Sequence, residues 1–261
     1  MAYAELHCHG DFSFLDGASP AEDLVERAVE LGLSALAVTD HQGLYGAVRF
    51  TAAARDASLH SIVGMEVELL DAAVADPHRV VVPARRRRRR DAAPVAPTAT
   101  ATAGEPIRVA TARQRPPGHR EPRREDLRGV RARELGPHLT LLAQDQTGYA
   151  NLCRLTSAAH LGGSKGVPRF THALLEEHAA GLIALTGCRH GELPRRLLAA
   201  DRDGAAAALA RLRELFPGDG RLYVELQHHL LPDDDWLVAE LARLAHQAGL
   251  PTVVTNDAHY A

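Results

Sequence analysis

Residues 4–41 read AELHCHGDFSFLDGASPAEDLVERAVELGLSALAVTDH, and this stretch decides the fold. We interpret residues 4–9 as a strand, residues 20–31 as an amphipathic helix and the apolar run at residues 35–39 as a second, buried strand. A strand, a helix and another strand in this order are typical of α/β proteins with parallel strands.

The same alternation continues along the rest of the chain. At 261 residues, 46% of them apolar, the chain can bury a full core, as one α/β barrel or as two small domains. Repeated strand–helix units indicate a parallel sheet that is either closed as a barrel or open and doubly wound. Further strands are predicted at residues 60–69, 79–82, 139–143, 182–186, 222–226 and 252–256, and helices at 44–57, 146–160, 171–178, 192–200, 204–216 and 233–247.

Residues 84–135 break the alternation. They contain fifteen arginines against six acidic residues, a net charge of about +9, which leaves about −12 for the rest of a chain whose total is −3. Six consecutive arginines lead into an Ala/Pro/Thr tract and then a Pro/Arg-rich stretch, a composition that buries too little apolar surface to order itself. We therefore expect a disordered Arg/Pro/Ala-rich insertion within a single domain spanning 1–261. A solvated loop is favoured for it over a contact with DNA phosphates.

Cysteine usage and hydropathy suggest a compartment. The three cysteines, Cys8, Cys153 and Cys188, are odd in number and widely spaced, which argues against a disulfide framework. No basic and apolar leader opens the chain, and no apolar run approaches the roughly 20 residues that span a bilayer. We expect a cytoplasmic protein that does not contact a membrane.

Two polar motifs follow the first two predicted strands. His7 and His9 are two residues apart, so on a strand both imidazoles face one side, as ligands of one metal must. Asp40 and His41 follow the second strand, at the end where parallel α/β folds collect ligands and catalytic groups. The alternatives are two incidental histidines on a half-exposed strand, and an Asp40 that only caps the next helix.

Acidic residues and histidines recur at later strands. Glu66 lies in an apolar strand, where a buried carboxylate needs a counter-charge, and a shared metal would supply one. The alternative is that Glu66 simply faces water on an edge strand. Asp257 and His259 repeat the spacing of the first histidine pair, and a carboxylate beside an imidazole suits Zn²⁺, Mn²⁺ or Fe²⁺. His138 begins a strand and Cys188 follows one, although a lone buried cysteine is more often an apolar filler.

Six segments of the sequence resemble successive motifs of the polymerase-and-histidinol-phosphatase (PHP) domain. The resemblance is to the domain that opens the bacterial DNA polymerase III α-subunit, and YAELHCHGDFSFLDGAS and VELQHHLLPDD are most similar to its error-prone, translesion branch. It covers residues 3–83 and 137–261. The six segments are HCHGDFSFLDGAS, LAVTDHQGLYGAVRF, IVGMEVEL, HLTLLAQDQTGYANLCRL, GLIALTGCRHGELP and TNDAHY.

The resemblance implies a distorted seven-stranded (β/α) barrel with up to three divalent ions (Zn, Mn or Fe) at the carboxyl ends of its strands. Carried over to this sequence, one ion is held by His7, His9, Glu66 and Asp257, and a second by Glu66, His138 and Cys188. A third is held by Asp16, His41 and His259. Cys188 stands where other PHP proteins carry histidine, and the insertion lengthens the loop before His138.

The resemblance also implies three functions for such a site. The first is metal-dependent phosphoester hydrolysis, with His41 or Asp16 assisting proton transfer. In some polymerases of the family the domain is a 3′–5′ exonuclease. In an error-prone relative we expect that exonuclease activity to be weak. The second is a non-catalytic, metal-stabilised module of a polymerase. The third is a free-standing phosphatase resembling histidinol phosphatase. In the polymerase the partners are DNA, single-stranded or at a primer end, and other replication or translesion proteins, but the polymerase catalytic region is not part of this sequence.

Overall fold

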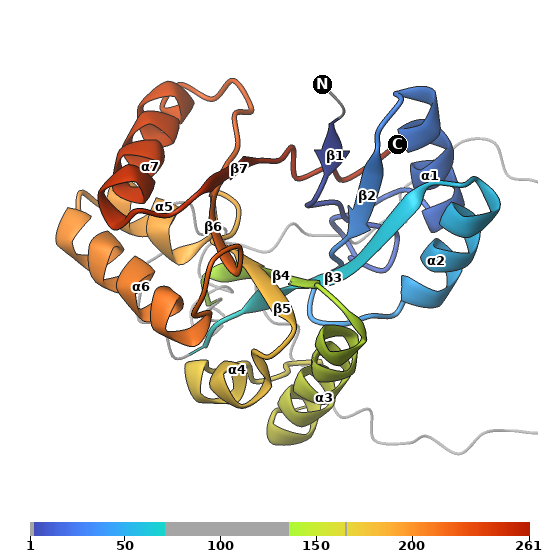
Figure 1. Ribbon diagram of the computed structural model, residues 1–261, viewed down its shortest axis with the longest axis horizontal. Helices are drawn as coiled ribbons and strands as arrows, with labels where there is room; N and C mark the ends of the chain where they lie inside the picture. Colours follow the sequence, from blue (N-terminus) through green and yellow to red (C-terminus); the bar gives the residue numbers. More distant parts are fainter. Residues whose placement is uncertain (1–2, 71–135, 165) are drawn as a thin grey trace, which may run out of the picture. The chain divides into compact units, whose positions relative to one another are not determined.

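A curled seven-stranded sheet forms the centre of the protein, and the helices lie on its outside (Figure 1). The computed structural model describes residues 3–70, 136–164 and 166–261. The strands are β1 (Ala4–Glu5), β2 (Ala35–Val38), β3 (His60–Glu68), β4 (His138–Ala143), β5 (Leu182–Leu185), β6 (Leu222–Leu226) and β7 (Thr252–Val254). The helices are α1 (Ala21–Glu30), α2 (Ala47–Asp56), α3 (Gln146–Gly162), α4 (His172–His178), α5 (Glu192–Leu198), α6 (Arg202–Leu215) and α7 (Asp234–Ala248).

The strands lie in the sheet in the order of the sequence, from β1 to β7. The two edge strands meet just beyond their ends, where Cys8 bridges Ala258 and the Ala258 N–H donates to the His7 carbonyl at 3.0 Å. This bridge brings the first and last motifs of the sequence together. The distorted seven-stranded α/β barrel predicted from the sequence is therefore confirmed, with β1 shorter than expected.

One strand departs from the predicted parallel sheet. β4 runs antiparallel to both of its neighbours, β3 and β5, while the other neighbouring pairs are parallel. An antiparallel neighbour needs no helical crossover, and the sequence shows no helical pattern between β3 and β4. Because β4 is reversed, its first residue, His138, lies at the same edge as the carboxyl ends of the other strands.

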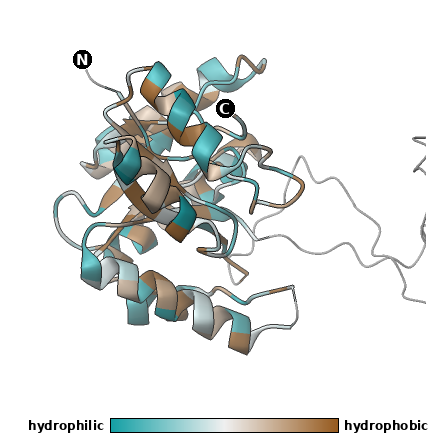
Figure 2. Ribbon diagram, turned by 90° about the vertical axis from the view of Figure 1, so that its right-hand side faces the viewer, coloured by the Kyte–Doolittle hydropathy of each residue, from teal (hydrophilic) through white to brown (hydrophobic). Residues whose placement is uncertain are grey.

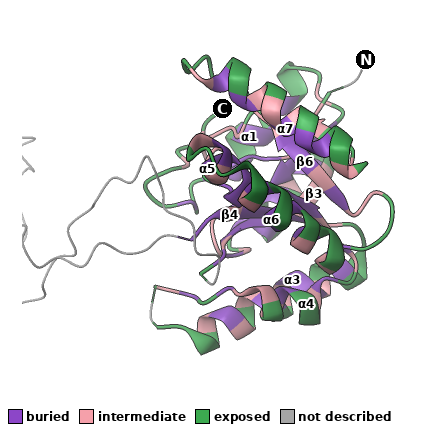
Figure 3. Ribbon diagram, turned by 90° about the vertical axis from the view of Figure 1, so that its left-hand side faces the viewer, coloured by how far each residue is buried: buried purple, intermediate pink, exposed green. Residues whose placement is uncertain are grey.

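Two apolar layers pack the helices against the sheet. On one side α1 and α2 bury Leu24, Val25 and Phe50 against β2. On the other side, helix α6 buries four residues in the larger core, which also contains residues of β3 to β6. These residues, Ala205, Ala208, Leu209 and Leu212, have the spacing of one helix face. Figures 2 and 3 show the result: the exposed faces of the outer helices carry most of the hydrophilic residues, and their buried faces point to the sheet.

The sheet interior has an apolar cluster and a polar end. Ala37, Leu142 and Leu185 form a small apolar cluster of their own, with Leu6, Ile62 and Ile183 packed against it. The polar end holds buried polar residues that follow or close the strands: Thr39, Asp40, Glu66, Thr140, Thr186, Glu225 and Thr255. Buried polar groups need partners, so this end is where ligand chemistry is expected.

Two sequence predictions fall outside the described residues: the strand at 79–82 and the disordered insertion at 84–135. The insertion and the domain limits of 1–261 therefore stay predictions. Within the described part of the chain, no helix combines the length and the apolar character needed to cross a membrane.

Candidate metal centre

The first two histidines point into the polar end of the barrel, as their spacing predicts. His7 Nε2 and His9 Nε2 lie 3.2 Å apart, and both imidazoles are buried. Cys8, between them, faces the opposite way into the core that α1 and α2 form with β2. The alternative of a half-exposed strand with incidental histidines is therefore excluded.

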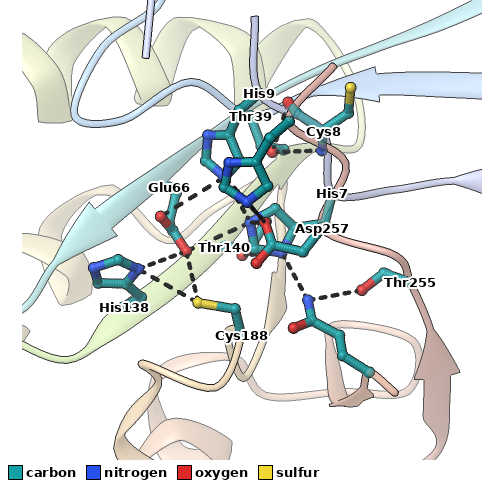
Figure 4. A network of polar contacts seen from close by, with 12 residues as sticks. His7, Cys8, His9, Thr39, Glu66, His138, Thr140, Cys188, Thr255 and Asp257 are labelled. Atoms are coloured by element: carbon teal, nitrogen blue, oxygen red, sulfur yellow. Dashed lines mark hydrogen bonds and ion pairs between the residues drawn. The ribbon is translucent and has the colours of Figure 1, made fainter. Parts of the chain in front are cut away.

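Glu66 lies at the centre of the cluster (Figure 4). Its Oε1 is 3.4 Å from His7 Nε2 and 2.9 Å from His138 Nδ1, and its Oε2 is 2.8 Å from His41 Nδ1. The Cys188 Sγ lies 3.4 Å from Oε1. Because the side chain is almost fully buried, the alternative in which Glu66 faces water on an edge strand is wrong.

Asp257 completes the inner part of the cluster. Its Oδ1 lies 3.3 Å from both His7 Nε2 and His9 Nε2 and 3.5 Å from His259 Nε2. Its backbone has a φ of 50°, in the left-handed region that aspartate tolerates better than most residues. This conformation turns the chain after β7 and aims the carboxylate at the two histidines.

His138 and Cys188 form a second group on the other side of Glu66. His138 Nδ1 and Cys188 Sγ are 3.5 Å apart. Gly187, just before the cysteine, has a φ of 89°, and a Cβ there would clash with the His138 carbonyl oxygen. The close approach of the two segments thus requires glycine, and it places His138 beside Cys188.

Asp16, His41 and His259 form the outer rim. Asp16 Oδ2 is 2.7 Å from His41 Nε2, and Asp16 Oδ1 is 3.2 Å from His259 Nδ1. The loop that carries Asp16 folds back so tightly that a Cβ on Gly17 would clash with the Gly10 carbonyl oxygen. Asp40 does not cap the next helix, whose N-cap is Gly46; it accepts hydrogen bonds from the Gly10 N–H and Ser13 Oγ and so holds this loop.

All nine residues predicted as ligands meet in one region. Their donor atoms form four groups of three in which the atoms lie within 4.8 Å of one another, and the groups share His9 and Glu66. A cavity of about 680 Å³ opens over them, large enough for a small phosphoester. The groups are His7–His9–Glu66, His9–Asp16–His41, His9–Asp257–His259 and Glu66–His138–Cys188.

The electrostatics of the cluster suit divalent cations. Burial alone would raise the pKa of Glu66, but His138, His41 and His7 hold the pKa of this carboxyl well below its usual range. Burial alone would lower the pKa of His7, but Glu225 and Asp257 raise it well above its ordinary value. Without metal, protons on the imidazoles thus balance the carboxylates, and binding cations take the place of these protons.

Two further observations test whether these residues fit a metal. Asp257 Oδ1 is buried and accepts no hydrogen bond among the described residues, although three imidazole nitrogens surround it. Burial, followed by the charge of Glu66, raises the pKa of the Cys188 thiol well above its ordinary value, so this sulfur needs a cation to become a thiolate. Imidazole, carboxylate and thiolate together match the donor set of Zn²⁺ and similar ions. The residues present fit the ions.

Several residues of the site were not predicted. Glu225 lies in an apolar strand, the signal that identified Glu66, and could have been found in the same way. Arg189, His190, His229, Leu231 and Tyr260 line the cavity from loops, where no local pattern marks them.

Comparisons with known proteins agree with the fold and the cluster. The family model described as PHP domain matches residues 5–229, which is most of the chain. The chain belongs to the PHP domain family. The resemblance seen in the sequence is thus confirmed.

Relatives of this PHP domain are found among bacterial polymerases. It is 43% identical to an error-prone DNA polymerase of Nocardia farcinica, over the whole chain and 22% of the relative. The identity is 40% to an error-prone DNA polymerase of Mycobacterium tuberculosis, over the whole chain and 19% of the relative. It is 33% to a DNA polymerase III subunit alpha of Treponema pallidum, over the whole chain and 18% of the relative. The chain spans about a fifth of the length of the relatives it matches.

Solved structures share the fold at low identity. A protein of Bifidobacterium adolescentis described as a metal-dependent phosphoesterase superposes with a TM-score of 0.53 at 15% identity, over 99% of this chain and 88% of the other. An amidohydrolase of Chromobacterium violaceum gives 0.52 at 15% identity with the same coverage. At this identity the likeness shows the fold.

Proposed function

We propose that this PHP domain binds two or three divalent cations and hydrolyses phosphoesters, as part of an error-prone DNA polymerase of the polymerase III α type. The observation that carries the proposal is the position of Glu66. Its Oε1 lies within 3.4 Å of nitrogen or sulfur atoms from both inner groups, His7 on one side and His138 with Cys188 on the other. A carboxylate in that position is suited to bridge two ions.

The nine residues are divided among the ions as the family resemblance implies, and the measured groups of three agree with that division in part: they join His9 to Asp16 and His41, and His9 to Asp257 and His259. His7, His9, Asp257 and Glu66 would hold the innermost ion, and Glu66, His138 and Cys188 the second. Asp16, His41 and His259 would hold a third at the rim, with His9 close enough to contribute to it. The ligand atoms already lie near one another, so the site needs little rearrangement to bind.

Bound divalent ions would supply a water whose pKa falls from 15.7 to about 7, and positive charge to offset that of the phosphoryl oxygens. The chain's own residues then orient the substrate. Tyr260 and Leu231 line the cavity over the site and are exposed to solvent, so they can contact an entering phosphoester. Arg189 in the same wall is held by Asp234 at 2.9 Å, which fixes its position at the cavity.

His41 and Asp16 are suited to move a proton. His41 Nε2 and Asp16 Oδ2 are 2.7 Å apart, and both side chains are partly exposed at the cavity mouth. Burial lowers the pKa of His41, but its contacts with Asp16 and Glu66 outweigh this and raise it to about 10 in the metal-free protein. The pair can pass a proton between the reacting oxygen and solvent when it is not occupied by the third ion.

The polymerase context comes from the relatives, which are several times longer than this chain. In that context the substrate would be DNA, single-stranded or at a primer 3′ end, and the activity a weak 3′–5′ exonuclease in the cytoplasm. Other replication or translesion proteins would be partners of the complete polymerase.

A hydrolysis assay tests this proposal. Metal-free protein is loaded with Mn²⁺ or Zn²⁺ and incubated with a 3′-labelled single-stranded oligonucleotide, an aryl phosphodiester and an aryl phosphomonoester. We expect cleavage of the diesters that chelation abolishes and that His9→Ala reduces by at least a hundredfold. Activity that His9→Ala leaves intact would show that hydrolysis comes from a contaminant or another site.

A second function is a metal-stabilised structural module, and one observation favours it: four of the nine ligands, His7, His9, Glu66 and Cys188, are buried, and the site joins segments from both edges of the sheet. Bound ions would then add to folding stability without turnover. Under this alternative chelation lowers the melting temperature while no phosphoester is cleaved at any metal concentration.

A further inference from the structure

Glu225 on β6 is a buried carboxylate that the metal site, as proposed above, does not use. It follows Leu222, Tyr223 and Val224 in the strand and lies inside the barrel, almost fully buried. Its backbone N–H donates to Thr186 Oγ1 at 3.0 Å, so the strand holds it firmly. Keeping a carboxylate out of water costs stability unless it gains strong partners.

Glu225 Oε1 has three hydrogen-bond partners. His7 Nδ1 lies 2.7 Å away, the Thr255 hydroxyl donates at 2.6 Å and the Gln227 amide donates at 3.0 Å. Thr140 Oγ1 also lies 3.3 Å from His7 Nδ1, and Figure 4 shows Thr140 and Thr255 in this network. A carboxylate oxygen can only accept, so the short contact to His7 requires the proton on Nδ1.

This contact decides which atom of His7 faces the site. With one proton on Nδ1 directed to Glu225, only the Nε2 proton has to leave when a cation binds. Nε2 then offers its lone pair to an ion held beside Asp257 and Glu66, whose oxygens lie 3.3 Å and 3.4 Å from this nitrogen. Histidine ligands in metalloproteins commonly donate their second nitrogen to such a carboxylate, which fixes the ring and makes the ligating nitrogen more basic.

We propose that Glu225 is a positioning residue that sets the tautomer and orientation of His7 and thereby the affinity of the innermost metal position. It acts through His7 and touches neither an ion nor a substrate. The inference rests on the proposed metal site and adds to it a residue of β6.

His9 offers a comparison within the same motif. Its Nδ1 lies 3.0 Å from Ser13 Oγ, which in turn donates to Asp40 Oδ1 at 2.8 Å. The carboxylate that supports His9 thus acts through a hydroxyl, whereas the one that supports His7 makes a direct contact. Loss of the direct carboxylate should therefore weaken metal binding more than loss of the Ser13 hydroxyl.

The test uses Zn²⁺ binding to the full chain, measured by competition with a chromophoric chelator. Glu225→Gln keeps the shape of the side chain and removes its charge. We expect its affinity for the tightest-bound ion to fall about 10- to 100-fold. The metal-free protein should melt at a lower temperature, because His7 loses its buried counter-charge. Glu192→Gln is the matched control, because Glu192 is equally buried but pairs with Arg196 and Arg211 away from the site; it should bind Zn²⁺ like the wild type.

A double-mutant cycle shows whether Glu225 acts through His7. In a His7→Ala background, Glu225→Gln should change Zn²⁺ affinity less than twofold; an equal loss in both backgrounds would overturn the inference. If Glu225→Gln does not fold, Thr255→Val serves instead, because it removes one donor to the same oxygen and should weaken Zn²⁺ binding in the same direction. A wild-type protein that binds no Zn²⁺ contradicts the proposed function itself, whereas wild-type affinity in a folded Glu225→Gln contradicts only this inference.

Discussion

The inner and outer parts of the candidate metal centre use the same residue types in different surroundings. The side chains of His7, Glu66 and Cys188 are at most 4% exposed, whereas those of His41, His259 and Asp16 are 26%, 31% and 43% exposed. Charges attract more strongly away from water, so the inner positions should hold cations more tightly than the rim. The inner part is suited to permanent ions, and the rim to one that exchanges.

The two parts also differ in how the chain builds them. Among the inner ligands, Glu66 and His138 lie on the paired strands β3 and β4, and the left-handed backbone of Asp257 is one that aspartate tolerates. At the rim, Leu15 before Asp16 and Gln42 after His41 have φ values of 72° and 56°, in the left-handed region that such residues rarely adopt. Backbone strain of this kind is common at functional sites, where surrounding contacts maintain it.

Replacement of Glu66 should have the largest effect. Glu66→Gln removes the charge that both inner positions share, so we expect both inner ions to be lost. Elemental analysis after desalting measures this directly. The matched control is Glu22→Gln, which removes an exposed partner of Arg49 and should keep the wild-type metal content. Full metal content in Glu66→Gln would mean that the carboxylate is not shared.

Removal of metal should have the next largest effect. A ligand present at 100 times its Kd stabilises the folded state by about 2.7 kcal/mol, so chelation should lower the melting temperature by roughly 5–10 °C for a domain of this size. Differential scanning calorimetry with and without a chelator measures the shift. In Glu66→Gln the shift should be small, and a shift as large as in the wild type would place the stabilising ion elsewhere.

Cys188 should determine metal preference at the second inner position. Cys188→Ser replaces a soft thiolate by a weak oxygen donor, so we expect Zn²⁺ affinity there to fall about tenfold or more, with a smaller loss for Mn²⁺. Competition titrations with both metals give the ratio. Cys153→Ser on α3 is the control, and equal losses for the two metals in Cys188→Ser would exclude a thiolate ligand.

Much of the fold and of the candidate metal centre was predictable from the sequence. All nine candidate ligands were identified from their positions beside predicted strands and from the family resemblance, and the structure brings them together. The reversed direction of β4 was missed, although the sequence has no helical pattern between β3 and β4 and a parallel neighbour would need such a crossover. Glu225 was missed although it repeats the signal of Glu66, since a carboxylate in a strand does not reveal whether it meets a metal or a histidine.

A rim substitution should have the smallest effect. Asp16→Asn removes a carboxylate that contacts only partly exposed histidines, and such pairs contribute about 1 kcal/mol or less to stability. We expect the outermost ion to bind more weakly while the two inner ions and the melting temperature of the metal-free protein stay close to wild type. Isothermal titration with Mn²⁺, after the inner positions have been loaded, measures the binding of the outermost ion alone. Loss of all ions in Asp16→Asn would mean that the inner and outer parts do not bind metal independently.

The position of Glu66 between two ions can be observed by anomalous diffraction from crystals grown with Zn²⁺, recorded on both sides of the zinc absorption edge. We predict two strong peaks, one among His7, His9 and Asp257 and one beside His138 and Cys188, each within bonding distance of a Glu66 oxygen. A single peak, or two peaks that leave Glu66 uncoordinated, would contradict the shared-carboxylate centre.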